Sequence, residues 1–193
     1  MAVTAAQFET MTPVAYSQAR PGLRTGDILL FDSSDIGSQV VEHFTHSVWC
    51  HAAMVWRMGH PVDRAMVLES VDTFGVRALR LSNKINGCAA SPKPYEGKLL
   101  VVRHADFPSD IPDAQQHAMM TFAVDRLGYP YSTKELLQIG IRIAAGMMGH
   151  DLPGEAGGGN SYICSEYVAR CYSALGITLA TDKEGFIAPG DRT

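Results

Sequence analysis

The sequence predicts an α+β fold with an antiparallel sheet in a single domain, and three observations indicate it. Short apolar runs bounded by turn residues, which are typical of strands, fill the first half of the chain. Apolar residues at helical spacing replace them in the second half, and strands followed by helices favour α+β over alternating α/β. The length of 193 residues suits one domain, and 46% hydrophobic with 19% charged residues excludes a disordered chain.

The first half supplies the expected sheet. The first twenty residues are polar and alanine-rich and are expected to form a short helix, and a second short helix is expected at 36–44. The segment 83–97 contains two prolines and two glycines and is interpreted as a loop. Apolar runs with turn residues between them predict five strands, at 26–31, 50–58, 64–71, 75–82 and 98–104.

The second half supplies the expected helices. Ser109 or Asp110 can cap a helix with Pro112 in its first turn, and Gly128 ends it. A second helix is expected at 132–148, followed by a flexible glycine-rich loop at 149–160. A last helix is expected from Cys164 to about residue 175, before a glycine stop.

Charge and hydropathy exclude several classes of protein. Sixteen basic and 20 acidic residues give a net charge of −4, and no dense lysine or arginine stripe indicates a nucleic-acid binder. The N-terminus lacks the basic and apolar regions of a secretory signal. The most apolar stretch, 136–149, is shorter than the ~20 residues of a membrane helix. A cytoplasmic protein without an integral membrane segment is therefore expected.

The four cysteines do not form a disulfide scaffold or a paired metal motif, so no metal and no cofactor is expected. Cys164 follows the glycine-rich loop and opens the last predicted helix, where the helix dipole lowers a thiol pKa and favours a nucleophilic thiolate. A small apolar core residue is the alternative. Cys171 lies ~10.5 Å further along that helix, too far for a disulfide, and is expected in the core.

A cysteine nucleophile needs a base, and His51 is the strongest of seven histidines because it alternates with small apolar residues on a predicted strand. Glu69 lies within the next strand, where an unpaired carboxylate is costly. A hairpin turn centred near residue 60 would pair position 51 with about 69. The two residues therefore predict either a base with its orienting acid or a structural pair between strands. Further candidates for substrate or oxyanion contacts are His46, Tyr131 and Ser165.

Short motifs in a fixed order carry a family resemblance. The chain resembles the circularly permuted NlpC-type cysteine hydrolases, the YiiX-like branch of the papain-like superfamily, over about residues 23–175. The motifs are TGDILLF at 25–31, THS at 45–47, CHAAMV at 50–55, VLES at 67–70, VVR at 101–103, GYPY at 128–131 and YICSE at 162–166.

The resemblance implies a permuted papain-like fold, a half-barrel sheet packed against helices, with Cys164 as nucleophile, His51 as base and Glu69 as the orienting residue. It also implies that 132–160 is a variable insertion in one domain spanning 1–193. The expected function is a cysteine hydrolase, an amidase or peptidase, that cleaves an amide or ester, with cell-wall-type peptides among its candidate substrates. The alternatives are a lipid acyltransferase or thioesterase with the same cysteine, and a non-catalytic ligand-binding module. The expected partners are a small molecule, a peptide or a lipid.

Overall fold

The structure of the chain is a computed structural model that describes residues 5–32, 49–89, 92–107, 113–134, 138 and 161–179. The helix expected at 36–44, nearly all of the helix expected at 132–148 and the glycine-rich loop 149–160 lie outside the described residues. The insertion and the single-domain division therefore stay predictions.

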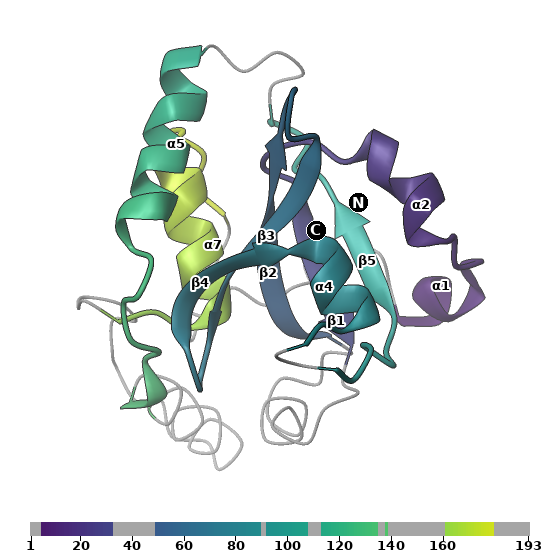
Figure 1. Ribbon diagram of the computed structural model, residues 1–193. Helices are drawn as coiled ribbons and strands as arrows, with labels where there is room; N and C mark the ends of the chain where they lie inside the picture. The colour runs from purple at the N-terminus through teal and green to yellow at the C-terminus, as the bar shows by residue number, and fades with distance from the viewer. Residues whose placement is uncertain are drawn as a thin grey trace.

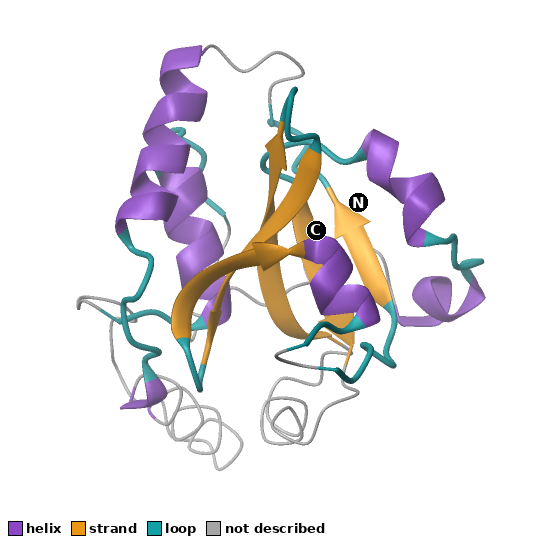
Figure 2. Ribbon diagram, in the orientation of Figure 1, coloured by secondary structure: helices purple, strands orange, loops and turns teal. Residues whose placement is uncertain are grey.

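Five strands form one antiparallel sheet in the order β4-β3-β2-β1-β5 (Figure 2). Each strand overlaps one of the five predicted runs, and every pairing is antiparallel, as the sequence predicts. The last strand returns to pair with the first, so β4 and β5 are the two edges of the sheet. The strands are β1 Ile28–Asp32, β2 Trp49–Met58, β3 Arg64–Val71, β4 Gly75–Arg80 and β5 Leu99–Val102.

Helices lie on both sides of the sheet (Figure 1). On one side α5, Asp113–Asp125, packs beside α7, Cys164–Ser173, and α7 contacts β2 and β3. On the other side lie the short helices of the N-terminal segment, which are α1 Ala5–Thr10, α2 Tyr16–Ala19 and the 3-10 turn η1 Arg20–Gly22, together with α4 Leu81–Asn86. The observed order of strands before the long helices confirms the α+β class.

Alternating side chains of the strands divide the core into two clusters. On β2, Ala52 and Met54 pack toward α5 and α7, whereas Ala53 and Val55 pack toward the opposite side. This alternation follows from the period of two residues along a strand. The middle of β2, Ala52–Val55, is buried on both faces, which explains why this strand reads as a nearly continuous apolar run.

The prediction for the segment after the fourth strand is wrong in one respect. The strand ends at Arg80, two residues before its predicted end, and α4 replaces the start of the predicted loop. Leu81 is fully buried and Ile85 is half-buried, so one turn of helix places both against the same core cluster. The helix ends at Gly87, whose positive φ of 77° suits glycine.

The outer edge of β4 is covered by the turn that follows α5. The Val76 N–H donates to the Tyr129 carbonyl, and the Gly128 N–H donates to the Val76 carbonyl, each at 2.8 Å. Gly75, at a φ of 66°, lies so close that a Cβ there would stand 2.0 Å from the Tyr129 oxygen. The edge is thus protected from pairing with another chain over this stretch.

Candidate active site

Cys164 is the first residue of α7, as the sequence predicts. The segment that delivers it is held against the sheet at Tyr162, whose carbonyl accepts a hydrogen bond of 2.7 Å from the buried Ser70 hydroxyl of β3. Tyr162 also forms a parallel bridge with Tyr131. These contacts place the thiol at a helix N-terminus, where the dipole stabilises a thiolate.

His51 of β2 and Glu69 of β3 are brought together, with 2.8 Å between His51 Nε2 and Glu69 Oε2. The hairpin register differs from the predicted one by two residues. Met54 pairs with Leu68, and continuing that register by one step places Glu69 opposite Ala53 rather than His51. The two side chains therefore meet as diagonal neighbours on one face of the sheet, within reach of long side chains.

The Glu69 carboxylate is fully buried and is surrounded by three cationic groups. Its Oε1 accepts hydrogen bonds from Arg77 Nε and Nη2 at 2.8 and 2.6 Å. Its Oε2 lies 3.2 Å from Lys84 Nζ, in addition to the contact with His51. Such a fork of donors holds a carboxylate in one orientation.

The contacts of Arg77 and Lys84 with Glu69 were not predicted from the sequence. Arg77 stands directly opposite Glu69 in the β3–β4 pairing. The predicted strands at 64–71 and 75–82 leave a turn centred at residue 73, which already implies that pairing. No comparable signal was present for Lys84, because it lies in the segment 83–97 that was interpreted as a loop. Lys84 Nζ also lies 5.1 Å from the centre of the Phe31 ring, and that ring packs 5.3 Å from the His51 ring.

The charges of the site favour an ion pair between thiolate and imidazolium. Burial alone would lower the pKa of His51, but hydrogen bonds and charges from Cys164 and Glu69 outweigh it and raise that pKa to about 9. Burial opposes ionisation of Cys164, but the hydrogen bond and charge of His51 hold its pKa below the ordinary value. Backbone N–H groups of Ala52 and Ser165 act in the same direction. His51 likewise keeps the pKa of buried Glu69 far below its usual range.

Of the three residues predicted to contact the substrate or the oxyanion, Ser165 and Tyr131 lie among the described residues. Ser165 is buried and its hydroxyl has no partner among the described residues, so its backbone N–H rather than its side chain lies at the thiolate. Tyr131 bridges to the residue two positions before Cys164, and its predicted role in the oxyanion site stays a prediction. His46 lies outside the described residues.

The other three cysteines differ from Cys164. Cys171 is fully buried and burial raises its pKa to about 12, which suits the predicted core position. The Cys50 thiol donates to the carbonyls of Phe31 and Asp32 at 3.3 and 3.0 Å. Cys88 is half-buried, and all four thiols are free of disulfides.

The described residues contain neither a metal-binding cluster nor a helix that could cross a membrane. Within these residues, no group of three or more histidine, cysteine, aspartate or glutamate side chains is placed to hold a metal ion. In the part of the chain that the structure describes, no helix is both long and apolar enough to cross a membrane.

Comparisons with known proteins agree with this architecture. The model of a family described as "Permuted papain-like amidase enzyme, YaeF/YiiX, C92 family" matches residues 22–184. Among solved structures, the crystal structure of metalloprotein yiiX from Escherichia coli O157:H7 superposes with a TM-score of 0.56 at 23% identity. The match covers 82% of this chain and 69% of that one, and at this identity it shows the fold. A search of curated proteins found no match.

The permuted papain-like order explains the arrangement of the site, in which the sheet carrying His51 precedes the helix that begins with Cys164. The family match covers most of the sequence and spans all five strands and α7. The chain belongs to the permuted papain-like amidases of the YaeF/YiiX, C92 family.

Proposed function

We propose that this protein is a cysteine amidase that uses Cys164 as nucleophile, His51 as acid and base, and Glu69 as the orienting residue. The observation that carries the proposal is the part-buried contact of 2.8 Å between His51 and Glu69 beside a thiol at the N-terminus of α7. The lowered pKa of Cys164 and the raised pKa of His51 support a reactive ion pair.

The chemistry proceeds through a thioester. The Cys164 thiolate attacks the amide carbonyl carbon, and the carbonyl oxygen becomes an oxyanion near the backbone N–H groups at the start of α7. The tetrahedral intermediate expels the amine, which takes its proton from the His51 imidazolium. Neutral His51 then removes a proton from water, which attacks the thioester and releases the acid. The thiolate and the imidazolium are thereby regenerated.

Glu69 assigns the roles of the two ring nitrogens of His51. Because Nε2 donates to the carboxylate, Nδ1 is the nitrogen left to exchange protons with the thiol and the leaving amine. The negative charge also stabilises the imidazolium that forms during acylation. Arg77 and Lys84 keep the carboxylate ionised and oriented, so we infer that they are positioning residues.

An acylation experiment tests the proposal without knowledge of the natural substrate. The purified protein is pulsed with p-nitrophenyl acetate, and intact mass and peptide mapping follow the acetyl group over time. We expect a transient acetyl adduct on Cys164 that decays in water, and no adduct in Cys164→Ala. Cys171→Ala is the matched control, since that thiol is buried and its pKa is raised.

The outcomes separate the alternative functions. A thioester that resists water but disappears when an amine or alcohol acceptor is added would indicate an acyltransferase. Absence of any adduct on Cys164 in the folded protein would overturn the enzymatic assignment and favour a binding module.

A further inference from the structure

Arginines gather around the turn that joins β2 to β3. Two of them flank that turn, because β2 ends one residue after Arg57 and β3 begins at Arg64. Arg80 stands on β4 opposite the third residue of β3, so it lies beside the same end of the sheet. Two more come from the segment before β1. The arginine cluster consists of these five of the eleven arginines in the chain, which are Arg20, Arg24, Arg57, Arg64 and Arg80.

Hydrogen bonds and ion pairs hold the segment before β1 at this turn. The Arg57 backbone N–H donates to the Thr25 hydroxyl at 3.0 Å, which places Arg24 beside the end of β2. The guanidinium groups of Arg20 and Arg57 both contact the Asp63 carboxylate within the turn, each at 2.5 Å. The cluster is therefore one surface, although its members come from separate parts of the sequence.

The charge of this surface is positive. Asp63, whose side chain is 55% exposed, is the carboxylate that the cluster contacts. Arg24, Arg64 and Arg80 are exposed and form no ion pair with a carboxylate of the described residues. Five cations and one contacting anion thus gather at one place in a chain whose net charge is −4. Such a concentration of one charge attracts an anionic partner.

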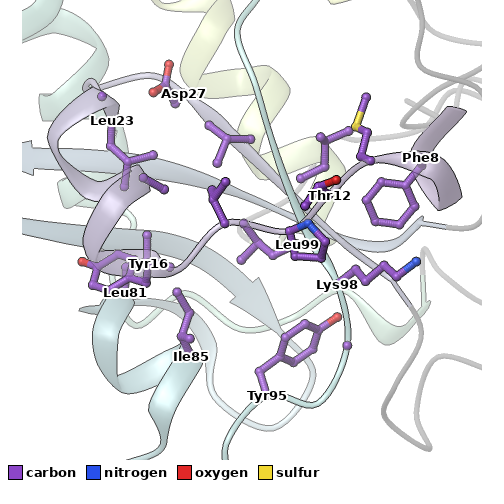
Figure 3. A pocket seen from close by; sticks show the side chains of 18 of the residues that line it. Phe8, Thr12, Tyr16, Leu23, Asp27, Leu81, Ile85, Tyr95, Lys98 and Leu99 are labelled. Atoms are coloured by element: carbon purple, nitrogen blue, oxygen red, sulfur yellow. The ribbon is translucent and has the colours of Figure 1, made fainter.

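The cluster lies far from the proposed catalytic centre. The strand β2 runs from His51 to its end at Met58 over ~23 Å, at ~3.3 Å per residue. The turn between β2 and β3 and the start of α7 accordingly lie at opposite ends of the sheet (Figure 1). A cavity of about 600 Å³ between the N-terminal segment and β5 is lined by none of the five arginines (Figure 3). Neither a substrate at Cys164 nor a ligand in that cavity explains the cluster.

The turn also presents an apolar side chain. Val62 is 47% exposed and is followed directly by Asp63, which holds two of the arginines. Planar guanidinium groups suit phosphate, which they bind through two parallel hydrogen bonds. At the surface of a bilayer, phosphates lie beside an apolar region, so both kinds of side chain gain contacts there. A soluble polyanion would use the arginines but would leave Val62 in water.

We propose that the arginine cluster docks this protein on an anionic phospholipid surface, with Val62 among the head groups. Each arginine near such a surface should raise the partition coefficient about fivefold. Docking at this end of the sheet leaves the start of α7 on the side away from the membrane. The proposal is independent of catalysis by Cys164.

The test is cosedimentation with sucrose-loaded vesicles, made either of phosphatidylcholine alone or of phosphatidylcholine and phosphatidylglycerol in equal amounts. Wild type and Cys164→Ala should bind the mixed vesicles equally, which separates docking from an acyl substrate held at the thiol. The neutral vesicles should bind much less of either protein. Raising NaCl from about 0.1 M to about 0.5 M should weaken binding to the mixed vesicles, because salt screens the attraction.

Removal of positive charge tests the cluster directly. Arg24→Gln combined with Arg80→Gln should weaken binding to the mixed vesicles at least about tenfold. Both residues are exposed, so the double variant should fold. Lys93→Gln combined with Lys134→Gln removes the same charge from exposed positions outside the cluster, and it should change binding less than about twofold.

Removal of negative charge should act in the opposite direction. Asp63→Asn deletes the carboxylate at the centre of the cluster and should strengthen binding to the mixed vesicles about fivefold. Asparagine also tolerates the φ of 43° at this position. Asp72→Asn, at an exposed carboxylate of the β3–β4 turn, is the matched control and should leave binding unchanged. A gain of affinity is not expected from damage to the fold.

Val62→Ser distinguishes a bilayer from a soluble polyanion. This variant should bind the mixed vesicles severalfold more weakly, because the apolar contact with the head-group region is lost. Its binding to long-chain polyphosphate, measured by fluorescence titration, should equal that of the wild type. Melting temperatures establish that each variant is folded, and Asp63→Asn keeps the test decisive if the arginine double variant fails to fold.

Three results would overturn the proposal. Equal binding to neutral and mixed vesicles would show that the arginines do not attract the surface. Wild-type binding of the mixed vesicles by the folded arginine double variant, or by Asp63→Asn, would place the contact elsewhere on the protein. Binding of polyphosphate without binding of the mixed vesicles would replace the membrane by a soluble polyanion.

Discussion

Replacing Glu69 with glutamine should make the Cys164 thiol much less reactive at mildly acidic pH. The substitution keeps the shape of the side chain but removes the negative charge beside His51 Nε2. It also leaves Arg77 and Lys84 as unneutralised positive charges near the imidazole. All of these changes disfavour the imidazolium, and the thiolate loses the charge that stabilises it.

The magnitude follows from the ordinary and shifted pKa values. Cys164 and Glu69 together raise the pKa of His51 from 6.5 to about 9 against the effect of burial. An opposite charge in contact shifts a pKa by ~1–3 units, and each unit corresponds to a factor of ten. We therefore expect the alkylation rate of Cys164 at about pH 6 to fall by at least about tenfold. The difference should shrink toward about pH 9, where thiols ionise without help.

The assay is alkylation with limiting iodoacetamide at a series of pH values, with the labelled cysteine identified by peptide mass mapping. Glu96→Gln, at an exposed carboxylate, is the matched control and should behave as wild type. Labelling spread over all four cysteines would report unfolding instead, so circular dichroism and mapping accompany each rate. The reasoning is refuted if folded Glu69→Gln labels Cys164 at the wild-type rate near pH 6.

Three further predictions concern the pH profile, the clamp on Glu69 and the edge of the sheet. Amide hydrolysis should decrease as pH rises through about 9, because His51 then loses the proton that the leaving amine needs. The rate of hydrolysis measured from about pH 5 to about pH 10 checks this, and a rate that still rises above about pH 9 contradicts it. Arg77→Met should lower the free energy of unfolding by about 3 kcal/mol, which is near the low end for breaking a buried pair because Arg77 is partly exposed. Urea unfolding measures this loss, with exposed Arg64→Met as the control, and an equal loss of stability in both variants contradicts the prediction. Gly75→Ala should destabilise by more than about 1 kcal/mol, since it combines a positive φ with a clash against Tyr129; thermal melts should show no such loss for Gly22→Ala, where a Cβ has open space.

The sequence predicted those features that depend on local patterns. Alternating and continuous apolar runs predicted the five strands, and the turn before Cys164 predicted a thiol at a helix start. The contact between His51 and Glu69 was expected because two polar groups in apolar strands need partners.

Features set by three-dimensional packing were not predicted. The two-residue difference in hairpin register changes the pair from directly opposite to diagonal, because a turn position inferred from composition does not define pairing to the residue. The helix α4 was missed because six residues are too few for a periodic pattern to stand out. With it Lys84 was missed, and so was the fork of cations that holds Glu69.

The position of Cys164 on α7, after the whole sheet, has a consequence for synthesis of the chain. The ribosome releases His51 and Glu69 first, and Cys164 emerges only after well over half of the protein has been made. Until α7 docks, the thiol lacks the imidazolium beside it and has the reactivity of an ordinary cysteine. Under the proposed function, a nascent or truncated polypeptide without α7 carries no hydrolytic activity, and fast alkylation of Cys164 would report completion of the fold in real time.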